Sequence, residues 1–156
     1  MVVSVKIKTH VWGIGNSILG DDGVGIYVAR MLKRLSPPGF EIVICESVPE
    51  NFAPLLKRKK PKHLVIVDAA QMNLPPGSIR RLPLDESTGP SEMTHGISIL
   101  PLLNYYNLSC LVTTIGIQPK TLDFSTELST PLRNAAKKVA KIILRSKYDE
   151  IPFLTS

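Results

Sequence analysis

A glycine-rich stretch near the amino terminus constrains the fold of this chain more than any other segment. Residues 13–25 read GIGNSILGDDGVG, and they separate an apolar, strand-like run from a helix-like one. A turn of this kind often holds a phosphate group through backbone N–H groups. Here the adjacent carboxylates of Asp21 and Asp22 would repel a phosphate at short range. The same carboxylates suit a metal ion, so the stretch predicts a cation site rather than an anion site.

Strand-like and helix-like runs alternate along the rest of the chain. The apolar run at 64–67 is continuous, which predicts a strand buried on both faces, as in a parallel sheet. This alternation predicts an α/β sandwich with a mostly parallel sheet, in which the first and third strands are neighbours near the centre. The expected strands are 3–12, 40–46, 63–68, 78–82 (short, at an edge) and 110–117; the expected helices are 23–35, 52–60, 97–106 and 131–146; and 147–156 is an expected loose tail.

Length and composition limit the class of protein. The chain has 156 residues, of which 44% are hydrophobic, which suits a single domain spanning 1–156. It lacks both an apolar run of the roughly 18–20 residues that cross a bilayer and the features of a secretory signal. We therefore expect a cytoplasmic protein that does not insert into membranes and acts as a monomer. Cys45 and Cys110 are not spaced as a CxxC pair, so we expect buried, reduced thiols.

The charge distribution leaves several kinds of partner open. The formal net charge is +6, and residues 57–62 read KRKKPK. Such a run can bind nucleic acid, but no aromatic residue interleaves with it and no nucleic-acid-binding motif accompanies it. Lysines at the end of a helix complement its dipole, so we interpret the run as a solvated helix end and expect no nucleic-acid partner. A basic surface also fits an acidic protein partner.

Two carboxylates are expected to meet at one edge of the sheet. Asp22 follows the first strand and Asp68 ends the third. In open α/β sheets, ligands bind beyond the carboxyl ends of the strands, at the point where the order of connection reverses. Consecutive residues at a helix start project in different directions, so Asp21 and Asp22 cannot easily both face this crevice. We expect Asp21 to cap the helix and Asp22 to face the site, although the reverse assignment is also compatible with the sequence.

A histidine is the third candidate ligand. His10 lies inside the first strand and His63 begins the third, so we interpret both as structural. His95 lies in a polar loop before an expected helix, and it completes an Asp/Asp/His set with Asp22 and Asp68. This set suits a borderline divalent metal such as Ni²⁺ or Zn²⁺, and the order of affinities alone does not choose between them. Three protein ligands leave positions open for water or substrate, as in catalytic metal sites.

Other catalytic and cofactor motifs do not fit. The sequence contains neither a Gly-x-Ser-x-Gly elbow nor a His-Glu-x-x-His motif. A dinucleotide fingerprint that begins at Gly13 and Gly15 needs a third glycine where Ile18 stands. Glu46 ends the second strand, where a ribose-binding acid would lie, but it is weak evidence without the glycine spacing.

The order of several motifs resembles one known family. Residues 15–25 closely resemble the N-terminal signature of the [NiFe]-hydrogenase maturation endopeptidases. Residues 67–69 (VDA) resemble its strand-ending aspartate motif, and residues 94–95 (TH) resemble its histidine motif. Three further segments, residues 47–51 (SVPEN), 73–80 (NLPPGSIR) and 116–119 (GIQP), resemble one branch of this family. That branch processes formate-hydrogenlyase-type (hydrogenase 3-like) large subunits. The resemblance runs from about residue 5 to residue 144.

This resemblance implies an endopeptidase that removes a short C-terminal extension from the hydrogenase large-subunit precursor after nickel insertion. Carried over position by position, it implies that Asp22, Asp68 and His95 are the catalytic and nickel-recognising residues. The nickel is then delivered by the precursor. The implied fold is a three-layer α/β/α sandwich with a five-stranded mixed sheet, whose antiparallel member is the strand at 78–82. The chain departs from the family pattern at 96–98 and at Ala70, and neither change removes an implied ligand.

In the mechanism that we hypothesise, nickel held by the precursor's own cysteines docks on the three residues and positions the scissile bond. The attacking water is activated either by the metal or by one of the aspartates. Two other classes of protein remain as alternatives: a nickel-binding chaperone or sensor without cleavage, and a nucleotide-binding α/β domain.

The loop around Asp22 is expected to support the site. Glycines there, with Gly25 at the helix start, allow unusual backbone angles and let a substrate segment approach closely. They also suit a tight strand-to-helix turn that needs glycine for its geometry alone. The supporting residues that we expect are Gly15, Asn16, Gly20, Asp21 and Gly23.

Overall fold

Strands and helices alternate along the part of the chain that the computed structural model describes, residues 6–83 and 99–155. The 3₁₀ turns are labelled η. In chain order the elements are β1 (Thr9–Ile14), η1 (Gly20–Gly23), α1 (Val24–Leu35), β2 (Phe40–Glu46), η2 (Pro49–Phe52), α2 (Ala53–Lys59), β3 (His63–Ala69), β4 (Ile79–Leu82), α3 (Ile99–Tyr105), β5 (Leu111–Ile117), α4 (Thr130–Arg145) and η3 (Tyr148–Glu150). The α/β alternation predicted from the sequence is confirmed.

The strands form one five-stranded mixed sheet in the order β2-β1-β3-β5-β4. β1 pairs in parallel with β2 and β3, and β3 pairs in parallel with β5. β4 runs antiparallel to β5 at the edge. The adjacent first and third strands and the antiparallel edge strand are therefore as predicted. Because the chain passes from β1 to β2 on one side and then crosses over β1 to β3 on its other side, the order of connection reverses between β1 and β3.

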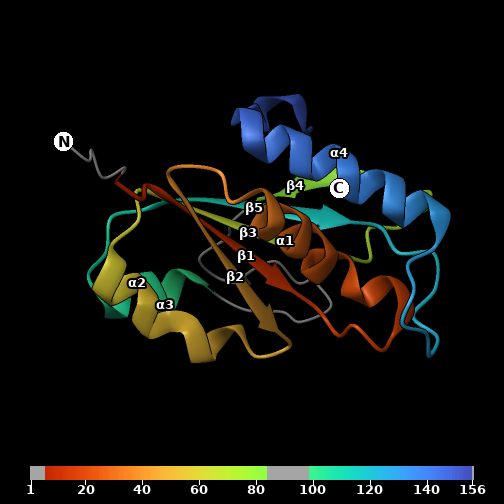
Figure 1. The fold of residues 1–156 in the computed structure, drawn as a ribbon, viewed down its shortest axis with the longest axis horizontal. Coiled ribbons are helices and arrows are strands. Elements are labelled where there is room, and N and C mark those ends of the chain that lie inside the picture. Colours follow the sequence, from red (N-terminus) through yellow and green to blue (C-terminus); the bar gives the residue numbers. More distant parts are fainter. Residues whose placement is uncertain (1–5, 84–98, 156) are drawn as a thin grey trace.

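Helices cover both faces of the sheet (Figure 1). α1 and α4 lie on one face, and α2 and α3 lie on the other. Alternate residues of β3 point to opposite faces of the sheet. Val65 and Val67 pack in the core with α1 and α4. Leu64 and Ile66 pack in the core with α2 and α3. This burial on both faces is the reason that the run is continuously apolar. The three-layer α/β/α sandwich is thus confirmed.

The first strand lies further along the chain than the expected range 3–12. It begins at Thr9 and continues through Gly13 to Ile14. Both of its neighbours limit its start, because Phe40 of β2 and His63 of β3 pair with Thr9. A strand inside a sheet extends only where neighbouring strands pair with it, and the described residues before Thr9, 6–8, belong to no strand.

The expectation that 147–156 is a loose tail is wrong for its described part, 147–155. Ile151 is buried in the core below α4. The backbone N–H of Arg81 donates to the Pro152 carbonyl, and the N–H of Leu154 donates to the Arg81 carbonyl, both at 2.8 Å. β4 is an edge strand with one open side, and the tail satisfies part of that side.

Helix ends follow their sequence signals closely. Residues 57–59 of the basic run form the exposed last turn of α2, and Lys60 ends the helix with a left-handed φ of 46°. α3 carries Pro101 in its first turn, where a proline is tolerated. Pro131 likewise lies at the start of α4. None of the helices within 6–83 and 99–155 has the length and hydrophobicity that crossing a bilayer requires.

Candidate active site

The glycine turn leads from the end of β1 into α1 and is held by its own backbone and by Asn16. The Asn16 side-chain oxygen accepts a hydrogen bond from the Ile18 N–H at 3.2 Å, and its carbonyl accepts one from Leu19 at 3.2 Å. The Gly15 N–H donates to the Glu46 carbonyl at 2.8 Å. A Cβ atom at Gly15 would collide with the Asp22 carbonyl oxygen, so only glycine permits this close return of the loop.

Asp22 lies in η1, and only 3% of its surface is exposed. Its Oδ2 accepts a hydrogen bond from the Asn16 N–H at 3.2 Å. Asp68 lies near the end of β3 and is fully buried, and its Oδ1 accepts a hydrogen bond from the Ala69 N–H at 2.8 Å. A buried carboxylate is costly unless hydrogen bonds or a cation offset its desolvation. Two such groups are therefore candidates for a functional site.

The sheet brings the backbones of these two acids to the same edge. Gly13 of β1 pairs with Val67, the residue before Asp68. η1, which carries Asp22, packs against β3. At Gly25 in the first turn of α1, a Cβ atom would collide with the carbonyl oxygens of Ile14 and Val67, so α1 sits directly on both strands. The edge lies at the carboxyl ends of β1 and β3, where the order of connection reverses.

The third predicted ligand, His95, lies outside the described residues. Within 6–83 and 99–155, no group of three histidine, cysteine or acidic residues is arranged to hold a metal ion. The Asp/Asp/His set therefore stays a prediction, two members of which lie at one edge of the sheet.

Asp21 does not cap α1, which corrects the prediction. The residue before α1 is Gly23, and no side chain caps the helix. The fully buried Asp21 carboxylate instead accepts four hydrogen bonds: from the backbone and hydroxyl of Ser129 at 2.7 Å each, from the Lys120 N–H at 2.8 Å and from the Thr121 N–H at 3.3 Å. Asp21 thereby fastens the segment between β5 and α4 to the turn that carries Asp22.

Gln118 holds the loop that follows Asp68, a role that the sequence did not reveal. Its side-chain oxygen accepts hydrogen bonds from the N–H groups of Met72 at 2.7 Å and Leu74 at 3.4 Å. Its amide nitrogen donates to the Gln71 side chain at 3.0 Å. The one signal available was a polar residue directly after a buried strand, where side chains meet at the carboxyl edge.

The two described histidines lie away from this edge, as the structural interpretation predicted. His10 is fully buried within β1. His63 begins β3 at the opposite edge of the sheet, and its Nε2 lies 2.7 Å from the Thr113 hydroxyl. Burial lowers the pKa of both imidazoles, so both favour the neutral form.

The cysteines are free thiols, as predicted. Burial, and to a lesser extent the charge of Glu50, raises the pKa of Cys45 to about 12. Such a thiol is not a nucleophile at neutral pH, because the thiolate is the reactive form. Cys110 is partly exposed, contrary to the expectation that both are buried, because it lies just before the start of β5.

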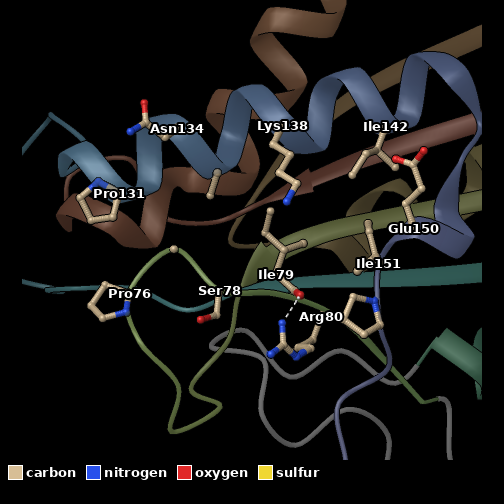
Figure 2. Close-up of a pocket in the computed structure, with 13 residues that line it drawn as sticks. Pro76, Ser78, Ile79, Arg80, Pro131, Asn134, Lys138, Ile142, Glu150 and Ile151 are labelled. Atoms are coloured by element: carbon tan, nitrogen blue, oxygen red, sulfur yellow. Dashed lines mark hydrogen bonds between the residues drawn. The ribbon is translucent and has the colours of Figure 1, made fainter.

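A cavity of about 520 Å³ lies between α4 and β4 (Figure 2), and neither Asp22 nor Asp68 lines it. Ile79 and Arg80 of β4 line one side, and Lys138 of α4 lines the other. Among the described lining residues the one acid is Glu150, which forms an ion pair with Arg145 at 2.9 Å. β5 separates β4 from β3, so this cavity does not adjoin Asp68. Its size alone does not make it the active site.

Fold and site together define an α/β sandwich protein with two buried carboxylates at the reversal point of a mostly parallel sheet. The family model of the hydrogenase maturation proteases matches residues 26–146. The chain is 32% identical over 127 residues to a putative hydrogenase maturation protease of Methanocaldococcus jannaschii, with 75% of each chain covered. It is 30% identical over 128 residues to the hydrogenase 3 maturation protease of Escherichia coli K12, which covers 81% of this chain and 82% of that protein.

Solved structures show the same likeness. A crystal structure of a hydrogenase 3 maturation protease superposes with a TM-score of 0.82 at 25% identity, covering 96% of this chain and 98% of the other. A [NiFe] hydrogenase maturation protease of Thermococcus kodakarensis superposes with a TM-score of 0.77 at 27% identity, covering 89% and 91%. The chain belongs to the hydrogenase maturation protease family. It is therefore an endopeptidase, a hydrolase of peptide bonds that acts in hydrogenase maturation.

Proposed function

We propose that this endopeptidase removes a C-terminal extension from the large-subunit precursor of a [NiFe] hydrogenase after nickel has been inserted. The names of two similar proteins, a hydrogenase 3 maturation protease and a [NiFe] hydrogenase maturation protease, support this substrate. The proposal includes action by a monomer in the cytoplasm. The observation that carries it is the pair of buried carboxylates, Asp22 and Asp68, on packed elements at one edge of the sheet.

The donor chemistry of this edge fits a nickel ion that arrives with the precursor as part of the substrate. Asp22 and Asp68 offer carboxylate oxygens, and His95 would add an imidazole nitrogen, a set that first-row divalent metals accept. Hydrogen bonds from the N–H groups of Asn16 and Ala69 fix the orientation of the two carboxylates. The nickel would supply a fixed template and a Lewis acid.

In the proposed reaction, Asp22 and Asp68 would hold the metal-loaded end of the precursor so that the scissile bond lies beside them. The oxygen of a water molecule adds to the carbonyl carbon, the C–N bond breaks, and a proton passes to the leaving amine. In one version, one of the two carboxylates accepts the proton from water. In the other, both carboxylates serve only as ligands. In both, the buried position of the acids excludes bulk water from the reacting groups.

The test of the substrate compares nickel-loaded with nickel-free precursor. We expect the purified protein to release a C-terminal peptide, detected by mass spectrometry, from the loaded precursor only. Binding of the loaded precursor without cleavage would instead identify a nickel-binding chaperone or sensor. Thermal stabilisation by nucleotides, with no effect of the precursor, would identify a nucleotide-binding domain.

The test of the site replaces its acids and its histidine one at a time. We expect Asp22→Asn, Asp68→Asn and His95→Ala each to lower the rate of processing by at least about 100-fold, the scale on which acid, base and ligand groups contribute. As controls for the cavity of Figure 2, Arg80→Ala and Lys138→Ala should retain the wild-type rate. A folded Asp68→Asn variant with full activity would overturn the assignment.

A further inference from the structure

We propose that an exposed apolar ridge beside the glycine turn, formed by Ile18, Leu122 and Phe124, is the surface on which the folded precursor docks. This inference rests on the proposed function, because it names where the same substrate makes contact outside the crevice. It concerns two segments that are far apart in the sequence and lie side by side in the structure (Figure 1).

Backbone pairing places Ile18 next to Phe124. Leu19 and Ser125 form a parallel bridge. The Ser125 N–H donates to the Ile18 carbonyl at 3.0 Å, and the Gly20 N–H donates to the Ser125 carbonyl at 2.8 Å. Ile18 and Phe124 each precede a residue of the bridge by one position, so on parallel segments they are neighbours. The ridge therefore joins the glycine turn to the segment before α4.

The side chains of the ridge are exposed to solvent. Phe124 is 81% exposed, Ile18 is 45% exposed and Leu122 is 36% exposed. Single exposed apolar residues are common on protein surfaces, whereas adjacent ones, such as Ile18 and Phe124 beside the backbone bridge, are candidates for an interaction site. A phenylalanine removes a large apolar area from water when a partner covers it, which makes it an effective anchor. The ridge thus suits an apolar surface of a folded protein.

The ridge is held in place by a buried clamp. The Asp21 carboxylate accepts hydrogen bonds from Lys120, Thr121 and Ser129, which flank Phe124 on both sides along the chain. The Thr121 hydroxyl accepts a further bond from the Asp123 N–H at 3.1 Å. A binding surface that is already ordered loses less conformational entropy when its partner docks. These bonds hold the backbone on both sides of Phe124.

The ridge is also continuous with the candidate active site. The Asp22 N–H donates to the Leu19 carbonyl at 3.1 Å, so the residue after Ile18 is bonded directly to the residue that carries the site carboxylate. A precursor that docks on Ile18 and Phe124 therefore lies next to the turn that carries Asp22. Leu111, which is 64% exposed at the start of β5, lies at the opposite edge of the sheet and offers a matched comparison.

The experiment measures processing as a function of the concentration of nickel-loaded precursor. Phe124→Ser, Phe124→Gln and the double variant Ile18→Ser/Phe124→Ser should fold as the wild type does, because Phe124 is largely exposed and Ile18 lies outside the buried core. We expect at least a tenfold increase in KM for the double variant, with kcat within twofold of the wild type. Leu111→Ser should leave both parameters unchanged.

The outcomes separate this inference from the proposed function. No cleavage by the wild-type protein would overturn the proposed function itself. Cleavage by the wild type with the same KM in the double variant would overturn the ridge alone, as would a fall in kcat at constant KM. Sedimentation of both proteins completes the test, since a wild-type dimer that the double variant converts to monomer would show that the ridge binds a second copy of this chain instead.

Discussion

At the residue scale, two adjacent aspartates have different partners. Asp21 bonds to the segment before α4, and Asp22 bonds to Asn16 in its own turn. The sequence correctly predicted that the two would diverge, since neighbours at a helix start point in different directions. It did not predict the partners of Asp21, because they lie 99 to 108 residues further along the chain. No local pattern encodes a contact of that span.

Asp21 is expected to contribute strongly to stability. In Asp21→Asn an amide group of the same shape faces four donors, so it loses acceptors and places its own N–H groups against them. Bonds to a buried charged group count for more than neutral ones, and we expect the free energy of unfolding to fall by about 2–4 kcal/mol. Urea unfolding measures this change. Asp123→Asn, an exposed acid of the same segment, is the control and should change it by less than about 0.5 kcal/mol.

At the element scale, the sequence predicted every strand and α-helix of the described residues, with errors at their ends, but it did not predict the 3₁₀ turns. Continuous apolar residues identified β3 because its burial on both faces is a local property of the chain. The start of β1 depends on where β2 and β3 begin, which is set by partners in space. The docking of the tail on β4 depends likewise on an open edge that no local pattern reveals.

Because α1 packs closely on the sheet, we expect a glycine-to-alanine substitution in this helix to destabilise the protein, whereas such a substitution usually stabilises a helix. Replacing a helical glycine by alanine normally stabilises a helix by about 1 kcal/mol. In Gly25→Ala the new methyl group would collide with the carbonyl oxygens of Ile14 and Val67, so α1 must move outward from β1 and β3. We expect the free energy of unfolding to fall by about 1–3 kcal/mol, measured in urea. Lys33→Ala, at an exposed position of the same helix, should be nearly neutral; a stabilised Gly25→Ala protein would show that the close packing is absent in solution.

At the scale of the whole molecule, the two edges of the sheet differ in chemistry. The carboxyl edge collects Asp22, Asp68 and Gln118, each placed by a different element. The order of the strands alone predicted that the two acids would share this edge, since it follows from general rules of connection. The edge at the start of β3 holds His63 against Tyr148, whose ring centroids are 4.8 Å apart. His63 and Tyr148 lie far apart in the sequence, so no local pattern predicts that their rings meet at this edge.

The buried histidines should make the stability of the whole protein depend on pH. Burial lowers the pKa of His10 and His63 from the ordinary value of 6.5. At His10 the charge of Glu41 raises the pKa, and the smaller effect of Lys59 lowers it further. An unfolded histidine takes up a proton near pH 6.5, whereas the folded protein resists this until a lower pH, so protonation favours the unfolded chain. The free energy of unfolding should therefore be full above pH 6.5 and fall as the pH decreases through the lowered pKa values, by at most about 1.4 kcal/mol per pH unit for each histidine. Urea unfolding between pH 7.5 and 5.5 measures the slope, which His10→Gln and His63→Gln should each reduce and the double variant should reduce further. A double variant with the wild-type slope would show that other groups, and not these imidazoles, couple folding to pH in this range.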